Sequence, residues 1–385
     1  MRSERNRKMS QPVAVLGLPL ANVTIDQAVE RVEQMIAQEG THQVATANLD
    51  FWLKSNSDPH LHRIIAGCDM VVADGMPLVW ASKFLGAPLP ERVTGVDMVP
   101  RLMELSVEKG YRIFLLGGGD GVAVAAKEMF ERQYPGVQIC GAFAPPVADL
   151  REMDHSEILD QVRAAKPHIL LVGFGNPKQE KWIWMHRRQL GVPVSIGIGG
   201  SMDMLLGRVK RAPKWMQRTG LEWFMRMMQE PRRLAPRYFK DFVGVMTRFP
   251  LALAATLLQR HYNGPTTTSR SNDANFLHLH IAGEITGELQ PVLERAVEEC
   301  RADARMLCLH LDNVVRIDPV GLGVLLEARR LLHEAGLTLQ AAHIPNRLRF
   351  QFFAWCTWPL IDELTVRTEP MATKRVQVAI PGGKN

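Results

Sequence analysis

The sequence has few cysteines and lacks the spacing that disulfide frameworks and zinc sites need. Its five cysteines are scattered over 385 residues, and none forms a C-x-x-C pair. An uninterrupted apolar run of the ~18 to 20 residues needed to span a membrane is also missing. The nearest candidate, residues 242–258, is broken by Arg248 and Pro250, and the basic N-terminus has no apolar stretch of signal-peptide type behind it. We therefore expect a protein of the reducing cytosol, in which residues 242–258 lie on a membrane or pack against protein.

Several catalytic signatures are absent as well. There is no Walker A motif and no G-x-S-x-G motif, and no two of the 17 aspartates are spaced D-x-D. The D-x-D carboxylate pair is common in metal-dependent sugar-nucleotide transferases, so its absence favours a metal-free site. The pairs His60/His62 and His278/His280 would each share one face of a strand, but no third ligand is evident. We expect these histidines to be surface or core residues, and no metal site.

The length and composition indicate a globular protein of two domains, because 385 residues exceed what one core usually organises. Residues 12–207 alternate short apolar runs with amphipathic stretches, which predicts a Rossmann-like α/β domain with a largely parallel sheet. Its predicted strands are residues 43–47, 70–73, 112–116, 137–142, 169–173 and 194–198. Its predicted helices are residues 25–38, 59–66, 76–84, 95–109, 121–133, 155–165 and 177–190.

Three further segments follow this domain. Residues 208–262 form a basic appendage, and residues 263–275 (NGPTTTSRSNDAN) are small and polar, as in a linker. Residues 276–370 then predict a small α/β domain. Its strands are expected at 276–282, 306–311, 337–342 and 360–365, and its helices at 288–302, 319–335 and 346–355.

The formal charge of +6 is concentrated in the appendage. Residues 208–260 contain twelve Lys or Arg residues and three acidic ones, interleaved with Trp, Phe, Met and Tyr. This mixture is typical of an interfacial amphipathic element whose cations meet anionic lipid or a lipid-linked phosphate. A solvated basic face and a nucleic-acid patch are the alternatives. The Met and Trp content favours the membrane surface over nucleic acid.

Glycine-rich turns follow three of the predicted strands, which places candidate chemistry at the carboxyl edge of the sheet. The first turn, GGGDG at residues 117–121, would let a phosphate approach backbone N–H groups at the start of a helix. A turn with a purely structural role is the alternative. It is no dinucleotide fingerprint, because Val122 replaces the last glycine of G-x-G-x-x-G and no acidic residue ends the next strand. An NAD-linked oxidoreductase is therefore disfavoured. The candidate substrate-binding residues in the three turns are Gly117, Gly118, Asn176, Gln179, Gly199, Gly200 and Ser201.

Asp74 ends the predicted strand at 70–73 and is a candidate general base. We expect burial at that edge to raise the pKa of such a carboxyl toward the range a base needs. A helix-capping aspartate is the alternative. Thr46 and Asn48 end the preceding strand on the same edge. Arg92 has a planar guanidinium that can donate paired hydrogen bonds to a diphosphate.

Nine motifs in this order are similar to those of the WecG/TagA/CpsF glycosyltransferase family (glycosyltransferase family 26). They read TANLDFW, DP, ADGMP, ERVTGVD, LLGG, GFGNPKQE, GIGGSMD, GRVKRAPKW and GLEWFMR, within about residues 12–240. The resemblance implies transfer of an N-acetylmannosamine-type or other sugar from a UDP-sugar to an undecaprenyl-diphosphate-linked acceptor. It also implies inversion, no required metal or cofactor, and a basic appendage that docks on the inner face of the cytoplasmic membrane.

The resemblance assigns roles by motif position. Asp74 matches the family's catalytic base, and Thr46 and Asn48 match its substrate-contacting pair. The remaining matches are a diphosphate-side arginine at Arg92, a pocket glutamine at Gln179 and the appendage arginines that close over the site at Arg226, Arg233 and Arg237.

The second domain resembles a STAS domain, the fold of anti-sigma-factor antagonists and of small lipid-transport subunits. The motif IDPVGLGVLL at residues 317–326, with Gly283 to Ile285 after the first strand, carries this resemblance. Val320 stands where switchable members have a phosphorylated Ser or Thr. Because valine has no hydroxyl, we expect a docking or regulatory surface, with a possible protein partner, in place of a phospho-switch.

Together these features predict a UDP-sugar-dependent hexosyltransferase of bacterial envelope or exopolysaccharide synthesis, peripheral on the cytoplasmic membrane and without a nucleic-acid partner. The alternative is a non-catalytic regulator that binds a nucleotide sugar and signals through the STAS domain. The presence of Asp74, Arg92 and Gln179 argues against a degenerate site.

Overall fold

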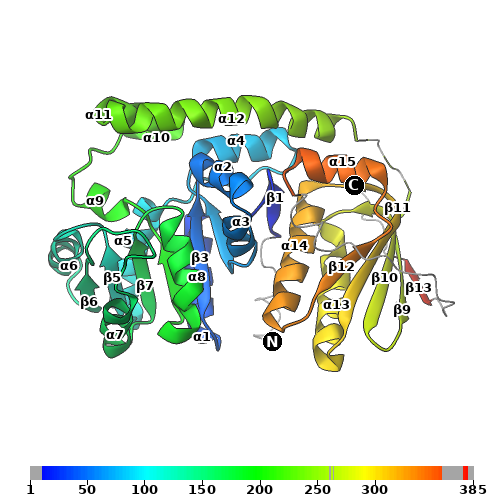
Figure 1. Cartoon of the computed structure of the whole chain (residues 1–385), viewed down its shortest axis with the longest axis horizontal. Coiled ribbons are helices and arrows are strands. Elements are labelled where there is room, and N and C mark those ends of the chain that lie inside the picture. Colours follow the sequence, from blue (N-terminus) through cyan, green and yellow to red (C-terminus); the bar gives the residue numbers. More distant parts are fainter. Residues whose placement is uncertain (1–10, 260–261, 263, 358–375, 380–385) are drawn as a thin grey trace. The chain divides into compact units, whose positions relative to one another are not determined.

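The computed structural model describes residues 11–259, 262, 264–357 and 376–379. Contacts divide the chain into two compact units. The first, here called the parallel-sheet unit, comprises Val23–Trp80 and Leu89–Val243. The second, here called the mixed-sheet unit, comprises the described residues before Val23, Ala81–Pro88 and the described residues from Gly244 onward. Each of these units has a sheet of its own (Figure 1).

The parallel-sheet unit is built on six parallel strands in the order β4-β3-β8-β7-β5-β6. Most residues of these strands are buried, as expected for a parallel sheet covered by helices on both faces. The predicted largely parallel α/β fold is therefore confirmed. The strands are β3 (His42–Ala47), β4 (Met70–Ala73), β5 (Ile113–Gly117), β6 (Ile139–Phe143), β7 (Ile169–Gly173) and β8 (Val194–Gly197).

Helices flank this sheet, and side-chain caps fix where several begin (Figure 1). Thr24 forms a capping box with Gln27 at α1, and Asp58 accepts a hydrogen bond from a backbone N–H in the first turn of α3. The sequence analysis missed α2, whose nine residues follow β3 directly. The helices are α1 (Ile25–Ala37), α2 (Leu49–Ser57), α3 (Pro59–Ala66), α4 (Met76–Phe84), α5 (Gly95–Lys109), α6 (Val122–Gln133), α7 (His155–Ala165), α8 (Lys178–Leu190) and α9 (Ser201–Leu205).

The basic appendage forms three helices, α10 (Lys214–Arg218), α11 (Glu222–Gln229) and α12 (Pro231–Leu257). None of the residues of α11 is buried. Trp223 of α11 and Tyr238 of α12 pack edge to face, with ring centroids 5.6 Å apart. Among the described residues, no helix is both long and apolar enough to be a membrane-spanning candidate.

The mixed-sheet unit has five strands in the order β12-β11-β10-β9-β13. Strands β10, β11 and β12 are parallel, whereas β9 runs antiparallel to β10 and β13 runs antiparallel to β9. The elements are β9 (Thr267–Asn272), β10 (Phe276–Ile285), a short 3-10 helix (Gly287–Leu289), α13 (Gln290–Asp303), β11 (Met306–Ile317), α14 (Pro319–Glu334), β12 (Leu339–Ala342), α15 (Asn346–Ala354) and β13 (Val376–Ala379).

The linker predicted at 263–275 is wrong over the residues of β9. This segment is a strand because its backbone pairs with β10, from Asn272 opposite Leu277 to Thr267 opposite Ala282. Its small polar composition conceals the strand, since the two buried residues of β9, Thr268 and Ser271, are themselves polar. The strand expected at 360–365 lies outside the described residues.

A hairpin near the N-terminus, β1 (Val13–Val15) and β2 (Leu18–Leu20), also belongs to the mixed-sheet unit. Both strands contact α14. Gly323 of α14 allows this approach, because a Cβ there would lie 2.1 Å from the Pro12 carbonyl oxygen. The sequence analysis counted these residues with the first domain, since nothing in their composition shows that they pack on a distant helix.

Candidate active site

The motifs predicted at strand ends follow strands of one parallel sheet. Because parallel strands point the same way, the loops after β3, β4, β5, β7 and β8 leave the sheet at the same edge. Asn48, Asp74, Gly118, Asn176 and Gly199 all lie within three residues of such a strand end. The fold therefore gathers the candidate residues from distant parts of the sequence.

Asp74 and Asn48 are neighbours because the strands before them are paired. Ala47 lies opposite Ala73 in the ladder, and the Asp74 N–H donates to the Ala47 carbonyl at 2.7 Å. The position of Asp74 is therefore set by the backbone of the sheet, which is a rigid support for a catalytic side chain.

Helix capping does not account for Asp74, because α4 begins two residues later and its N-cap position falls on Gly75. Capping does describe Asn48, whose Oδ1 accepts a backbone N–H of α2 at 3.1 Å. Thr46 is also engaged by the fold, since its hydroxyl donates to the Gly197 carbonyl at 2.9 Å and joins β3 to β8. Thr46 and Asn48 thus shape the edge beside Asp74, and their direct contact with substrate stays a prediction.

The surroundings of Asp74 raise its pKa to about 7. Burial is the main cause, because it disfavours the charged carboxylate. The positive charges of Arg92 and Arg226 act in the opposite direction, and the negative charges of Glu222 and Asp97 raise the pKa further. A carboxylate with this pKa is protonated about half of the time near neutral pH and is well matched to accept a proton.

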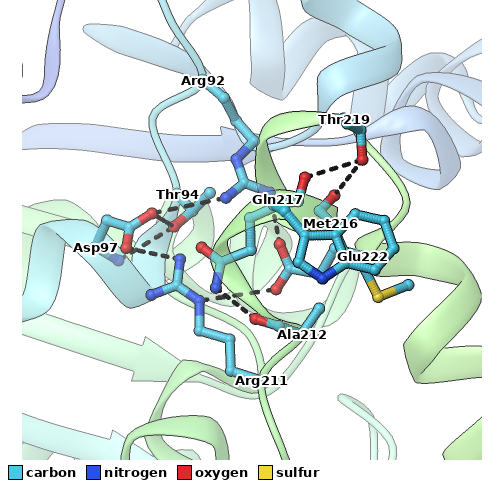
Figure 2. Close-up of polar contacts among 10 residues, drawn as sticks. Arg92, Thr94, Asp97, Arg211, Ala212, Met216, Gln217, Thr219 and Glu222 are labelled. Carbon is cyan, nitrogen blue, oxygen red and sulfur yellow. Dashed lines mark hydrogen bonds and ion pairs between the residues drawn. The ribbon is translucent and has the colours of Figure 1, made fainter.

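Arg92 reaches this region from the loop between α4 and α5 and is held by two carboxylates. Its Nη1 lies 2.6 Å from Glu222 Oε2, and its Nη2 lies 3.9 Å from Asp97 Oδ2 (Figure 2). Arg211 joins the same two carboxylates, with Nη2 2.7 Å from Asp97 Oδ1 and Nε 3.8 Å from Glu222 Oε1. The Thr94 hydroxyl donates to Asp97 Oδ2 at 2.7 Å. Two arginines and two carboxylates thus alternate in one network.

The Arg92–Glu222 pair is largely buried, with the two side chains 13% and 14% exposed. A carboxylate presents two oxygens to a guanidinium much as a phosphate does. Glu222 therefore engages the group that the sequence analysis assigned to a diphosphate. The sequence analysis missed the roles of Glu222 and Arg211. The only signal was that Glu222 is one of three acidic residues in a strongly basic segment.

Gln179 is buried and ties two glycine turns together. Its Oε1 accepts the backbone N–H of Gly175 at 3.1 Å and that of Gly199 at 3.0 Å. Its Nε2 donates to Glu180 Oε1 at 2.7 Å, and a Cβ on Gly197 would lie 2.5 Å from that nitrogen. Gln179 thus positions the turns, and its contact with substrate stays a prediction.

The other turn residues also have defined local roles. Gly117 and Gly118 have φ values of 94° and 84°, which an L side chain rarely adopts. The Ser201 hydroxyl donates to the Ile198 carbonyl at 2.5 Å, and Gly200 precedes α9. Backbone conformation and local side-chain bonds therefore account for the shape of these turns, and the role of the turns in binding stays a prediction.

Asn176 carries an unsatisfied side chain at the same edge. Its Oδ1 and Nδ2 are buried, and neither has a hydrogen-bond partner among the described residues. Its backbone carbonyl accepts a hydrogen bond from Lys54 Nζ at 3.1 Å, which holds the residue in place. An unpaired buried amide costs about 1 to 3 kcal/mol. A polar substrate group beside it would recover that free energy.

Two of the three predicted appendage arginines are brought to this edge. Arg226 lies close enough to Asp74 for its charge to lower the pKa of that carboxyl. Arg237 forms an ion pair with Asp50 of α2, with Nη2 2.9 Å from Oδ2. The side chain of Arg233 lies outside the described residues.

The fold and this site define an α/β protein whose candidate active site lies at the carboxyl edge of its parallel sheet, where arginines and carboxylates meet. The chain belongs to the family described as Glycosyl transferase WecG/TagA/CpsF, which matches residues 13–261. It is therefore a glycosyltransferase of the hexosyltransferase type, and the resemblance predicted from the nine motifs is confirmed. The residues after 261, including most of the mixed-sheet unit, lie beyond that match.

Two curated relatives carry the same name, N-acetylglucosaminyldiphosphoundecaprenol N-acetyl-beta-D-mannosaminyltransferase. The relative from Bacillus spizizenii is 32% identical over 190 residues, which are 49% of this chain and 72% of that protein. The relative from Staphylococcus aureus strain MW2 is 28% identical over 230 residues, which are 59% of this chain and 89% of that protein.

Proposed function

We propose that the chain is an inverting, metal-independent transferase that moves an N-acetylmannosamine-type or related sugar from a UDP-sugar to an undecaprenyl-diphosphate-linked acceptor. The names of the relatives support this class of sugar and acceptor. The observation that carries the proposal is Asp74, a carboxyl whose pKa is raised to about 7 at the sheet edge, close to the charges of Arg92 and Arg226.

In this reaction Asp74 is the general base. Its carboxylate takes the proton of the acceptor hydroxyl as the hydroxyl oxygen bonds to the anomeric carbon of the donor sugar. The bond from that carbon to the β-phosphate oxygen breaks in the same step, and the electron pair leaves with UDP. Attack from the face opposite UDP inverts the configuration. Arg92 and Arg226 stabilise the negative charge that grows on the departing diphosphate.

Arg92 exchanges partners in this mechanism. Its guanidinium is paired with Glu222, so it must leave this carboxylate before it can bind a diphosphate. The carboxylates of Glu222 and Asp97 stay paired with a cation after this exchange, because Arg211 already lies beside both. Glu222 thus holds the guanidinium in place until substrate arrives.

The appendage is proposed to lie on an anionic membrane surface, where the lipid-linked acceptor resides. Within residues 208–243 its basic side chains accompany exposed apolar ones, and aromatic rings with cations are the groups that interfacial helices use. The exposed apolar residues are Trp215, Leu221, Trp223, Phe224, Met228, Phe239, Phe242 and Val243.

The mixed-sheet unit is proposed to be a STAS-like docking or regulatory module. Its three parallel strands and the helix that begins directly after Asp318 support this assignment. Asp318 caps α14 by accepting the Gly321 N–H at 2.6 Å, and Val320 is partly exposed in the first turn. A partner that recognises this turn would bind without phosphorylation, since Val320 has no hydroxyl.

The test is transfer on anionic phospholipid vesicles that carry undecaprenyl-diphosphate-GlcNAc, with EDTA present and a panel of UDP-sugars. We expect UDP release and a lipid-linked product with one donor, for the wild type and for the control Asp160→Asn on the exposed surface of α7. We expect both to fall by about 10²- to 10⁴-fold with Asp74→Asn. Tight UDP binding without turnover, for every donor, would favour the regulator alternative. Activity that disappears with EDTA would overturn the metal-independent mechanism.

A further inference from the structure

A cluster of histidines lies on two adjacent strands of the mixed-sheet unit, apart from the site above. In the parallel pairing of β10 and β11, His278 lies opposite Cys308 and His280 lies opposite His310. Residues that face each other in a ladder project from the same side of the sheet. The expectation that no third ligand accompanies His278 and His280 is therefore wrong, because the neighbouring strand supplies two more candidates.

The ligand atoms of three of these side chains lie close enough to share one ion. His278 Nδ1 is 3.0 Å from His310 Nε2, and Cys308 Sγ is 3.8 Å from the same nitrogen. One ligand atom from each residue lies within 4.8 Å of the other two. Bonds of about 2.0 Å to nitrogen and about 2.3 Å to sulfur place tetrahedral ligands at similar separations.

Asp273 orients His278 for this role. Its Oδ2 lies 2.9 Å from His278 Nε2. A carboxylate oxygen accepts, so this contact favours the hydrogen on Nε2 and leaves Nδ1, the atom that faces His310, as the nitrogen available to a metal. A carboxylate behind a histidine is the arrangement that fixes the tautomer of metal-binding imidazoles.

His310 and Cys308 are suited to a metal of borderline softness. His310 Nε2 faces both His278 Nδ1 and Cys308 Sγ, and an imidazole nitrogen in that position can donate its lone pair to such a metal. Cys308 is 1% exposed, and a bound cation would displace its thiol proton to solvent. The stacked ring of His280, with its centroid 4.0 Å from that of His310, closes one side of the cluster.

We propose that His278, Cys308 and His310 form a binding site for a zinc-class divalent ion, with one coordination position left for water or another ligand. Imidazole and thiolate ligands select zinc and its neighbours over magnesium and calcium. The site is independent of the transferase chemistry and gives the mixed-sheet unit a ligand of its own. Binding by the unit's partner, or the unit's stability, would then respond to zinc.

The test uses the full chain, purified without a histidine tag, reduced, and dialysed against EDTA and then buffer. Co²⁺ is the probe, because tetrahedral thiolate coordination gives intense visible bands and a thiolate-to-metal charge-transfer band. Zn²⁺ then displaces Co²⁺ and gives the zinc affinity. The variants are Cys308→Ser, His310→Gln and Asp273→Asn. The controls in the same unit are Cys300→Ser, a buried thiol on α13, and His333→Gln, an exposed imidazole on α14.

We expect one ion per chain in the wild type and in both controls. Cys308→Ser should lose the charge-transfer band, His310→Gln should lose saturable binding, and Asp273→Asn should weaken zinc binding by about 10- to 100-fold. Zinc should raise the Tm of the wild type and leave that of His310→Gln unchanged. If a ligand variant does not fold, the Asp273→Asn result still decides, because Asp273 lies on the surface.

The proposal is overturned if the wild type shows no saturable Co²⁺ or Zn²⁺ binding. It is also overturned if the charge-transfer band survives in Cys308→Ser, or if Asp273→Asn binds zinc as tightly as the wild type. In those cases the cluster is a hydrogen-bonded group of imidazoles only.

Discussion

Arg92 Nη1 lies 2.6 Å from Glu222 Oε2, and these two residues act in opposite directions on the same carboxyl. The charge of Arg92 lowers the pKa of Asp74, whereas that of Glu222 raises it. Any event that parts the pair, such as the arrival of a diphosphate, therefore alters the electrostatic field at the proposed base. We therefore expect substrate binding and the strength of the proposed base to be coupled through this contact.

The pH dependence of transfer should report Asp74 directly. A base must be deprotonated, so kcat/KM should rise with pH through the pKa of about 7 and level off above it. Asp74→Asn should reduce kcat by about 10²- to 10⁴-fold and abolish this limb, with UDP affinity retained. The measurement is initial UDP release from pH 5 to 9 at fixed ionic strength. An unchanged limb in the residual activity of Asp74→Asn would assign the proton acceptor to another group.

Glu222→Gln should shift the ascending limb to lower pH. Removing a negative charge near Asp74 lowers the pKa of its carboxyl, and Arg92, released from its carboxylate partner, adds to the effect. Glu230→Gln makes the same charge change in the same basic segment and is the matched control. We expect UDP to bind Glu222→Gln at least as tightly as the wild type, measured by calorimetry. A shift of equal size in both variants would mean that only net charge matters.

Arg92→Lys should weaken UDP binding by about 10- to 100-fold. Lysine keeps the positive charge but lacks the planar guanidinium that donates paired hydrogen bonds to a diphosphate. Arg92→Gln should weaken binding further and move the ascending limb to higher pH, because it removes a charge that lowers the pKa of Asp74. Arg101→Lys, in a surface ion pair with Asp26, is the control and should bind UDP normally. Equal affinities of Arg92→Lys and the wild type would remove Arg92 from the diphosphate site.

Glu180 should make the protein less stable as the pH rises. It is 1% exposed, and burial raises its pKa to about 7 from 4.5, so the folded state binds more protons than the unfolded state between these values. Stability is lost as the pH rises through that window, by roughly 3 kcal/mol at most. Glu180→Gln should therefore raise Tm by several degrees at pH 8 and by much less at pH 5. The exposed Glu128→Gln should show no such pH-dependent gain, and the same absence in Glu180→Gln would contradict the argument.

Local patterns predicted the sheet and its polar edge well. Strands β4 and β7 match their predicted bounds, because buried apolar runs that end in Asp or Gly are local signals. Asp74 could be singled out for the same reason. The Arg92–Glu222 contact joins residues 130 positions apart, and no local sequence pattern shows which earlier residues the appendage contacts. Likewise, His310 joins His278 only through the register of two strands.

Exposed aromatic side chains on the appendage should hold the enzyme on the membrane. Trp215 and Phe239 are 61% and 71% exposed, and moving one such ring into the headgroup region contributes about 1.5 kcal/mol or more. Trp215→Ser with Phe239→Ser should therefore weaken binding to anionic vesicles by about 100-fold in a sedimentation assay, while UDP affinity in solution stays the same. Phe353→Ser, which removes an exposed ring from α15, is the control. If the double variant binds vesicles normally but salt still releases it, the basic residues alone carry the attraction, and the aromatic face serves another contact.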